Sequence, residues 1–257
     1  MIPSTFNTYV GIVFDLDRPD ADMIVWPDIV QGLSQIARFS GQSPVFLSVA
    51  QHSVQVAQSL REKRCPPEVQ WEGLMHDAEE AYPPGDIARP CKYLSEMKPA
   101  VAIQQRIRLL VARKFGLPTT KSTAVDEEDK HQCSVEQNAF RDIAHGCLAR
   151  EWAWSPEHAR FMFQAWAIMI LSERPHSQDL LDMICSTATD GVVRMALSMG
   201  LCCQPDPLKS WESNMADDLR AVFARYGFDP NGPAFPGLIA SLEQIHAEGS
   251  KRDGSHD

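Results

Sequence analysis

The chain lacks the marks of a secreted or membrane protein. Its seven cysteines are odd in number and none forms a CxxC pair, so a disulfide framework is disfavoured and reduced, mostly buried thiols are expected. No apolar run reaches the ~18 residues of a membrane-spanning helix. The first residues also lack the pattern of a signal peptide. We therefore expect a cytoplasmic protein that does not bind a membrane.

Positive charge is scarce as well. Twenty-four Lys and Arg face 34 Asp and Glu, giving a formal net charge of -10 at pH 7, and no basic stripe offsets this acidity. Broad binding to nucleic acid is therefore disfavoured, and no stable nucleic-acid complex is expected. A protein of this kind that handles phosphate must gather its positive charge locally, in a pocket.

What the sequence does contain is helical periodicity, which predicts an all-α helical bundle. Hydrophobic residues make up 44% of 257 residues, enough for one large domain or a domain of ~150 residues with an extension. Before the first helix we expect an irregular arm or hairpin over residues 1–28. The predicted helices span 28–41, 48–64, 74–82, 99–115, 129–148, 155–171, 178–199, 210–226 and 236–247. We expect three parts: a core over 1–148, a helical extension over 149–248 and a disordered tail over 249–257.

The stretch from Leu74 to Tyr82 carries the clearest chemical signal. On a continuous helix, His76 and Glu80 are four residues apart and Asp77 and Glu80 are three apart, so all three can face one cavity. One imidazole and two carboxylates among apolar residues suit a divalent cation and its bound water. An adjacent His-Asp pair is common by chance, however, so the surrounding pattern has to decide.

That pattern is a single His, a His-Asp pair and a late Asp on successive predicted helices. Taken alone, His52 on the apolar side of its helix is more often a core residue. Asp129 closes an acidic run from Asp126 that alone is more often a solvated helix start. A helical bundle can nevertheless bring His52, the pair and Asp129 to one centre.

This ordered series resembles the HD-domain metal-dependent phosphohydrolases, most closely the compact branch with bacterial 5′-deoxynucleotidases and phage dATP triphosphohydrolases. The likeness covers roughly residues 8–148. It is carried by Asp28–Ser34, Arg38–Gly41, Ser48–Ser53, Leu74–Tyr82, Gly85–Lys92, and Asp129 with Glu136 seven residues later.

The resemblance implies a site with one divalent metal ion, which the ligand types leave open as Mn, Co, Fe, Mg or Zn. The implied metal ligands are His52, His76, Asp77 and Asp129. The implied catalytic residues are Glu80, which orients or deprotonates the metal-bound water, and Asp86, a second acid near the phosphate. The implied substrate-binding residues are Arg38 and Lys92, which grip phosphate oxygens, and Phe39, which packs on the nucleoside.

The function implied is hydrolysis of a phosphate of a deoxynucleoside mono- or triphosphate. Within enzymes, a signalling or non-nucleotide phosphate is the alternative substrate. Outside enzymes, the alternative is a non-catalytic nucleotide-binding regulator or assembly subunit whose metal site is structural or degenerate. A mere binder needs no second acid, and this favours the enzyme. Exposed helical faces leave a homo-oligomer open.

Two features depart from that branch. Its triphosphatases often carry a lysine three residues before the last aspartate, whereas this chain has Asp126, which should repel a polyphosphate unless Lys121 or Lys130 substitutes. The residues after 148 match no part of the family. We expect this extension, which contains Trp152 and Trp154, to pack on the core and to shape the pocket or an oligomer interface.

Overall fold

The computed structural model of the chain describes residues 4–146, 152–189, 191–193 and 195–196. The chain divides into two compact units, residues 1–192 and 193–257, and all elements named below lie in the first. The α-helices are α1 (Trp26–Gln35), α2 (Val49–Glu62), α3 (Pro67–Met75), α4 (Arg89–Lys92), α5 (Lys98–Phe115), α6 (Thr123–Ala144), α7 (Pro156–Glu173) and α8 (Gln178–Cys185). Short 3₁₀ turns are η1 (Ala21–Met23), η2 (Arg38–Gly41), η3 (Ala78–Ala81) and η4 (Ser95–Met97).

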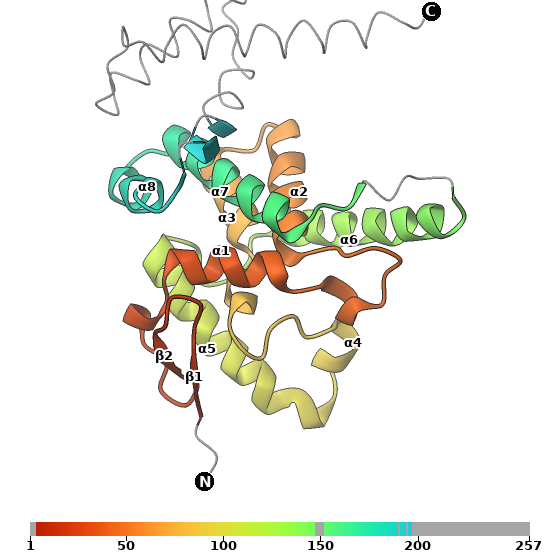
Figure 1. Cartoon of the computed structure of the whole chain (residues 1–257), viewed down its shortest axis with the longest axis horizontal. Coiled ribbons are helices and arrows are strands. Elements are labelled where there is room, and N and C mark those ends of the chain that lie inside the picture. Colours follow the sequence, from red (N-terminus) through yellow and green to blue (C-terminus); the bar gives the residue numbers. More distant parts are fainter. Residues whose placement is uncertain (1–3, 147–151, 190, 194, 197–257) are drawn as a thin grey trace, which may run out of the picture. The chain divides into compact units, whose positions relative to one another are not determined.

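The predicted all-α fold is confirmed, with a small hairpin as its β structure among the described residues (Figure 1). Strands β1 (Thr5–Asn7) and β2 (Val13–Asp15) pair antiparallel. They form the expected N-terminal hairpin. None of the described helices combines the length and apolar character needed to cross a membrane.

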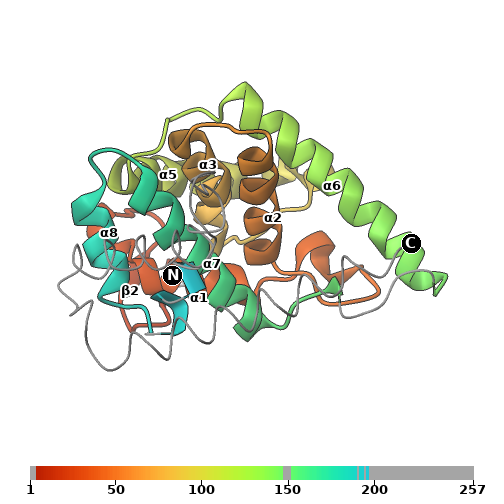
Figure 2. The same ribbon diagram turned by 90° about the horizontal axis from the view of Figure 1, so that it is seen from above.

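The core is organised around Trp26 at the start of α1. Its ring stacks on Trp71 of α3 and Phe163 of α7, at centroid distances of 6.4 and 5.7 Å, and lies 6.2 Å from Phe115 of α5. All four rings are buried, and burial of such large apolar surfaces dominates the stability of a core. Helix α7 lies beyond residue 148, yet it packs on α1, α2 and α3 (Figures 1 and 2).

The predicted boundaries fared unevenly. The helix starts predicted at residues 48 and 155 are confirmed, because Ser48 and Ser155 cap α2 and α7 by accepting hydrogen bonds from the N–H groups of Gln51 and His158. Gly116 ends α5 in a left-handed conformation, with φ of 63°. The predicted division of the chain at residues 148 and 248 stays a prediction, and the helices expected at 210–226 and 236–247 and the tail at 249–257 lie outside the described residues.

The helix starts predicted at residues 28 and 129 were wrong, because the acidic residue at each of these positions lies inside the helix and does not begin it. Helix α1 begins at Trp26, and the Asp28 carboxylate instead accepts a hydrogen bond from Val10 N at 3.0 Å. Helix α6 begins at Thr123 with Ser122 as its cap, so Asp129 lies well inside it. The described thiols, Cys65, Cys91, Cys133 and Cys185, are free and only half-buried.

The segment with the His-Asp pair is not the continuous helix that the spacing predicts. Helix α3 ends at Met75, and Asp77 leaves the helical region with φ of -116° and ψ of 21° before η3 begins. A break in the backbone therefore turns His76, Asp77 and Glu80, and the i,i+4 geometry does not apply to them. The break is held from outside by Arg108 of α5, whose guanidinium donates to the carbonyl of His76 at 3.1 Å.

Close packing between α1 and η3 requires a glycine at position 32. A Cβ atom there would lie 2.6 Å from the carbonyl oxygen and 2.8 Å from the Cα of Ala81, which are backbone atoms that cannot move alone. Glycine to alanine inside a helix ordinarily adds about 1 kcal/mol of stability. We expect Gly32→Ala instead to lower the free energy of unfolding by about 1–3 kcal/mol, as measured by urea denaturation. A gain in stability would show that η3 yields without strain.

Candidate metal centre

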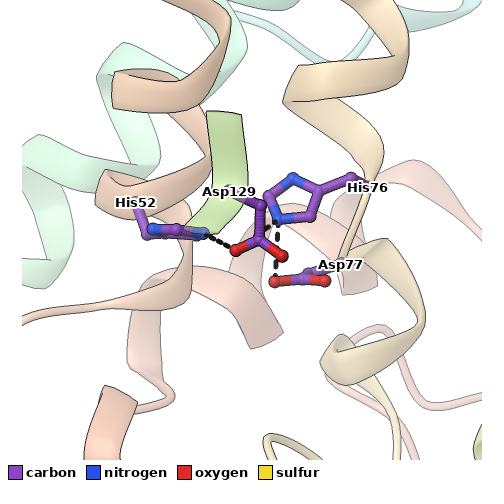
Figure 3. A group of neighbouring side chains, drawn as sticks. All are labelled: His52, His76, Asp77 and Asp129. Carbon is purple, nitrogen blue, oxygen red and sulfur yellow. Dashed lines mark hydrogen bonds and ion pairs between the residues drawn. The ribbon is translucent and has the colours of Figure 1, made fainter. Parts of the chain in front are cut away.

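Two histidines and two aspartates from three segments converge on one point (Figure 3). His52 comes from α2, His76 and Asp77 follow α3, and Asp129 comes from α6. Each offers one ligand atom, and these atoms all lie within 4.8 Å of one another. Both imidazoles are buried and both carboxylates are nearly so. The structure thus brings together the four predicted ligands.

The orientation of His76 fits a metal ligand. Its Nδ1 donates to the carbonyl of Gly73 at 2.7 Å, which leaves Nε2 facing the cluster. Nε2 is buried and has no hydrogen-bond partner among the described residues, although Asp77 Oδ2 lies 3.0 Å away. A buried nitrogen without a hydrogen bond, close to carboxylate oxygens, is the arrangement expected of atoms that share a cation.

His52 is fixed in the same way by Glu136, seven residues after Asp129 on α6. Its Nδ1 lies 2.6 Å from Glu136 Oε1, and its Nε2 lies 3.2 Å from Asp129 Oδ1. With the proton of Nδ1 donated to Glu136, the lone pair of Nε2 points into the cluster. Glu136 is fully buried and also accepts from Arg38 Nε at 3.1 Å. Such a carboxylate behind a histidine is typical of metal sites.

The charges of the cluster influence one another strongly. Burial would lower the pKa of His76, but the carboxylates of Asp77 and Asp129 together outweigh it and raise that pKa to about 9. Burial would raise the pKa of Asp77 and of Asp129, but the histidines and Lys121 hold both pKa values below their usual range. The carboxylates are therefore ionised at neutral pH, and a metal ion has to displace the proton of His76.

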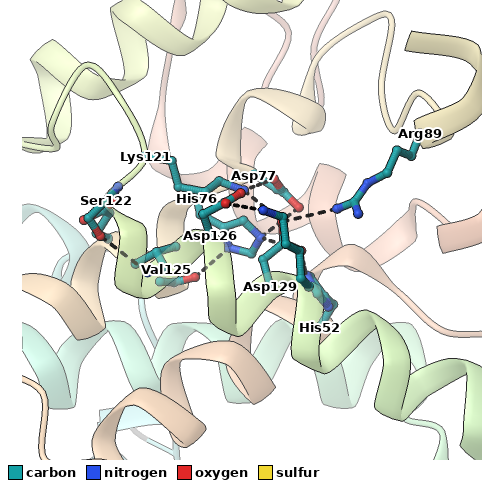
Figure 4. A network of polar contacts seen from close by, with 12 residues as sticks. His52, His76, Asp77, Arg89, Lys121, Ser122, Val125, Asp126 and Asp129 are labelled. Carbon is teal, nitrogen blue, oxygen red and sulfur yellow. Dashed lines mark hydrogen bonds and ion pairs between the residues drawn. The ribbon is translucent and has the colours of Figure 1, made fainter. Parts of the chain in front are cut away.

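Two cations that were not among the predicted site residues reach Asp129 from different directions (Figure 4). Lys121 Nζ lies 3.0 Å from Asp129 Oδ2 and 3.9 Å from Asp77 Oδ1. Arg89, the first residue of α4, places Nη2 4.0 Å from Asp129 Oδ2. Asp126, by contrast, pairs with Lys130, and both side chains are about half exposed.

The predicted acids Glu80 and Asp86 belong to the same region. Glu80 is buried, its Oε2 has no hydrogen-bond partner among the described residues, and its Oε1 lies 3.4 Å from Lys92 Nζ. Burial, and then the charge of Asp77, raise the pKa of Glu80 well above its usual range. Burial also raises the pKa of Asp86, although Arg38 opposes this. Glu80 therefore holds a proton to a higher pH than an exposed glutamate does.

Arg38 and Phe39 occupy a strained turn beside the cluster. Phe39 and Ser40 both have positive φ, 55° and 54°, in the left-handed region that non-glycine residues rarely adopt. The turn directs the Arg38 guanidinium inward, where Nη1 lies 4.0 Å from Asp77 Oδ2. The Phe39 ring contacts Phe140 edge to face at a centroid distance of 5.2 Å.

The segment after residue 151 reaches this side of the site as well. Gln51, the neighbour of His52, is buried and donates to the carbonyl of Trp152 while accepting from the N–H of Trp154. The Trp152 ring lies 6.3 Å from Phe140, edge to face. Phe39, Phe140 and Trp152 thus form an aromatic group that draws on three segments of the chain.

The sequence offered different signals for the residues that were missed. Glu136 was noted as part of the resemblance but was given no role, although seven residues from Asp129 is two helical turns and places both on one face of α6. Arg89 lies three residues before Lys92, within the stretch Gly85–Lys92 that carries the resemblance. Lys121 lies in the connection between α5 and α6, where no periodicity predicts which way a side chain points.

Comparison with known proteins adds a relative. No protein-family model matches the chain. The chain is 34% identical over 171 residues to the uncharacterized protein YfdR of Escherichia coli (strain K12), and the match covers 62% of the chain and 92% of YfdR. A similarity of this strength over nearly the whole relative means that the chain belongs to the same family as YfdR.

Proposed function

We propose that the protein is a metal-dependent phosphohydrolase of the HD-domain type that acts on deoxynucleotides. The observation that carries the proposal is the convergence of His52, His76, Asp77 and Asp129 on one point, with acids and cations around it. The donor set of imidazoles and carboxylates, with no thiolate among the four, suits Mn, Co, Fe, Mg or Zn. A divalent ion bound there would lower the pKa of a bound water molecule and polarise a phosphoryl oxygen.

The residues around the four ligands stabilise charge and transfer protons. Arg38 and Lys92 offset the charge that develops on the phosphoryl group, and they provide the local positive charge that an acidic protein needs. Glu80, with its raised pKa, holds or accepts a proton beside Asp77. Asp86 is the second acid, and the positive charges of Arg38 and Lys92 both act to lower its pKa.

An aromatic group supports a nucleotide over a simple phosphate ester. Phe39 follows Arg38 directly, so an aromatic face and a phosphate-binding guanidinium lie next to each other; the guanidinium carbon is 5.3 Å from the ring centroid. A base stacks on such a face with a gain of about 1–3 kcal/mol. Phe140 and Trp152 extend the apolar surface away from the charged cluster.

The direct test measures release of phosphate, pyrophosphate and triphosphate from deoxy- and ribonucleoside mono- and triphosphates, with Mn, Co, Mg and Zn. We expect metal-dependent turnover of one group of nucleotides. Absence of turnover by folded protein supplied with these metals would favour a non-nucleotide substrate or a nucleotide-binding regulator. Metal analysis separates the last two, since a regulator with a degenerate site shows no metal-dependent stabilisation.

The role of Glu80 in proton transfer predicts a specific kinetic effect. We expect Glu80→Gln to lower kcat by about 10²–10⁴-fold while metal affinity stays the same, because Glu80 is not one of the four converging ligands. The matched control is Glu79→Gln, since the neighbouring carboxylate faces Arg108 instead, at 3.5 Å. Equal losses in the two variants would mean that both act through the fold of η3.

A further inference from the structure

The cations around the cluster outnumber those that a phosphate ester needs. Arg38, Arg89, Lys92 and Lys121 come from three segments of the chain: η2, α4, and the connection between α5 and α6. Of these, Arg38 forms an ion pair with the buried carboxylate of Glu136. Lys92 is 37% exposed and contacts Glu80 at 3.4 Å. Lys121 and Arg89 share Asp129.

The position of Lys121 points to a second partner. Its side chain is only 20% exposed, and a buried ammonium is unfavourable unless it is paired. Both of its partners, Asp129 and Asp77, are carboxylates that converge with the two histidines on the candidate metal point. A divalent ion draws on the same two carboxylates, and the mostly buried Lys121 then needs another anion, which Arg89, on the same oxygen of Asp129, can also reach.

We infer that Lys121 and Arg89 bind phosphate groups of the substrate, and that the site is built for a nucleotide with more than one phosphate. This inference rests on the proposed function. A single phosphate group carries about two negative charges, whereas a phosphate chain brings more charge and more oxygen atoms over a greater length. Three cations at the cluster, Arg89, Lys92 and Lys121, suit the chain better than the single group.

The objection raised by Asp126 does not hold in the folded protein. Its carboxylate is 45% exposed and forms an i,i+4 ion pair with Lys130 at 2.5 Å. Lys130 therefore offsets the acid, and Lys121 supplies the positive charge from the connection before α6. A lysine three residues before Asp129 is not required for phosphate binding when the neighbouring segment provides one.

The test is isothermal titration calorimetry, which measures how tightly the full-length protein at saturating Mn²⁺ binds inorganic tripolyphosphate and orthophosphate. We expect tripolyphosphate to bind at least about ten-fold more tightly. Lys121→Gln and Arg89→Gln should each weaken tripolyphosphate by about ten-fold or more and orthophosphate by less than about three-fold. Lys130→Gln is the matched control and should change neither. Arg89 is 56% exposed, so its variant should fold whatever becomes of Lys121.

A titration with Mn²⁺ alone distinguishes phosphate binding from structural support. Removal of a cation from beside Asp129 and Asp77 should leave Mn²⁺ binding to Lys121→Gln unchanged or tighter. Weaker Mn²⁺ binding in that variant, or equal wild-type affinity for the two anions, would overturn the inference. These titrations do not depend on turnover. If the protein hydrolyses no nucleotide, that result contradicts only the proposed function. If the protein hydrolyses monophosphates but does not bind tripolyphosphate more tightly than orthophosphate, that result contradicts only the inference.

Discussion

Asp77→Asn is expected to remove metal binding and turnover together while leaving the chain folded. The carboxylate lies 3.0 Å from His76 Nε2 and interacts with Arg38 and Lys121 as well. An amide keeps the shape of the side chain but has no charge to hold a cation. Loss of a metal that supplies several kcal/mol to the transition state lowers kcat by at least about 10³-fold.

The same variant can be tested without a substrate. A ligand present at about 100 times its dissociation constant stabilises the native state by about 2.7 kcal/mol, so metal should raise the Tm of the wild type. We expect no such rise for Asp77→Asn. The matched control is Asp126→Asn, an identical change at a half-exposed position of α6, which should retain the rise. If Asp77→Asn were stabilised by metal like the wild type, the four residues would not form the metal site.

The residues of the cluster could be predicted from the sequence, but their geometry could not. His76, Asp77 and Glu80 were assigned to one helical face, whereas the chain leaves the helix at His76 and enters η3 at Ala78. Local propensity favours a helix throughout this segment. Contacts from distant elements, namely Gly32 of α1 against Ala81 and Arg108 of α5 on the carbonyl of His76, accompany the turn. Such contacts leave no local pattern in the sequence.

The helices themselves were predicted well where periodicity and caps coincide. Ser48, Ser155 and Gly116 mark real boundaries because each satisfies backbone groups at a helix end. Asp28 misled because an acidic residue in the first turn stabilises a helix without being its cap. Asp129 misled because it ends an acidic run that begins at Asp126, the acidic residue of the first turn of α6. The predicted site residues lie at the cluster or border it, but their chemical roles stay predictions until metal and substrate are tested.

We expect replacement of the Glu136 side chain to lower the stability of the protein more than replacement of any other side chain of the site. Glu136 is fully buried on α6 and accepts from two donors, His52 Nδ1 at 2.6 Å and Arg38 Nε at 3.1 Å. In Glu136→Gln the amide has one acceptor oxygen, so its NH₂ group faces one of the donors. The change also leaves the mostly buried Arg38 without its closest counter-charge. Breaking a buried ion pair in this way costs about 3–5 kcal/mol.

We therefore expect Glu136→Gln to lower the free energy of unfolding by about 3 kcal/mol in urea with a chelator present, which removes any contribution from metal. With His52 no longer held in one orientation, metal affinity should fall by about 10–100-fold. Glu127→Gln, an exposed position on the same helix, should change the free energy of unfolding by less than about 0.5 kcal/mol. Normal stability with weakened metal binding would make Glu136 only an anchor of His52. Reduced stability with normal metal binding would mean that it serves Arg38 and the fold, since the orientation of His52 would then not depend on it.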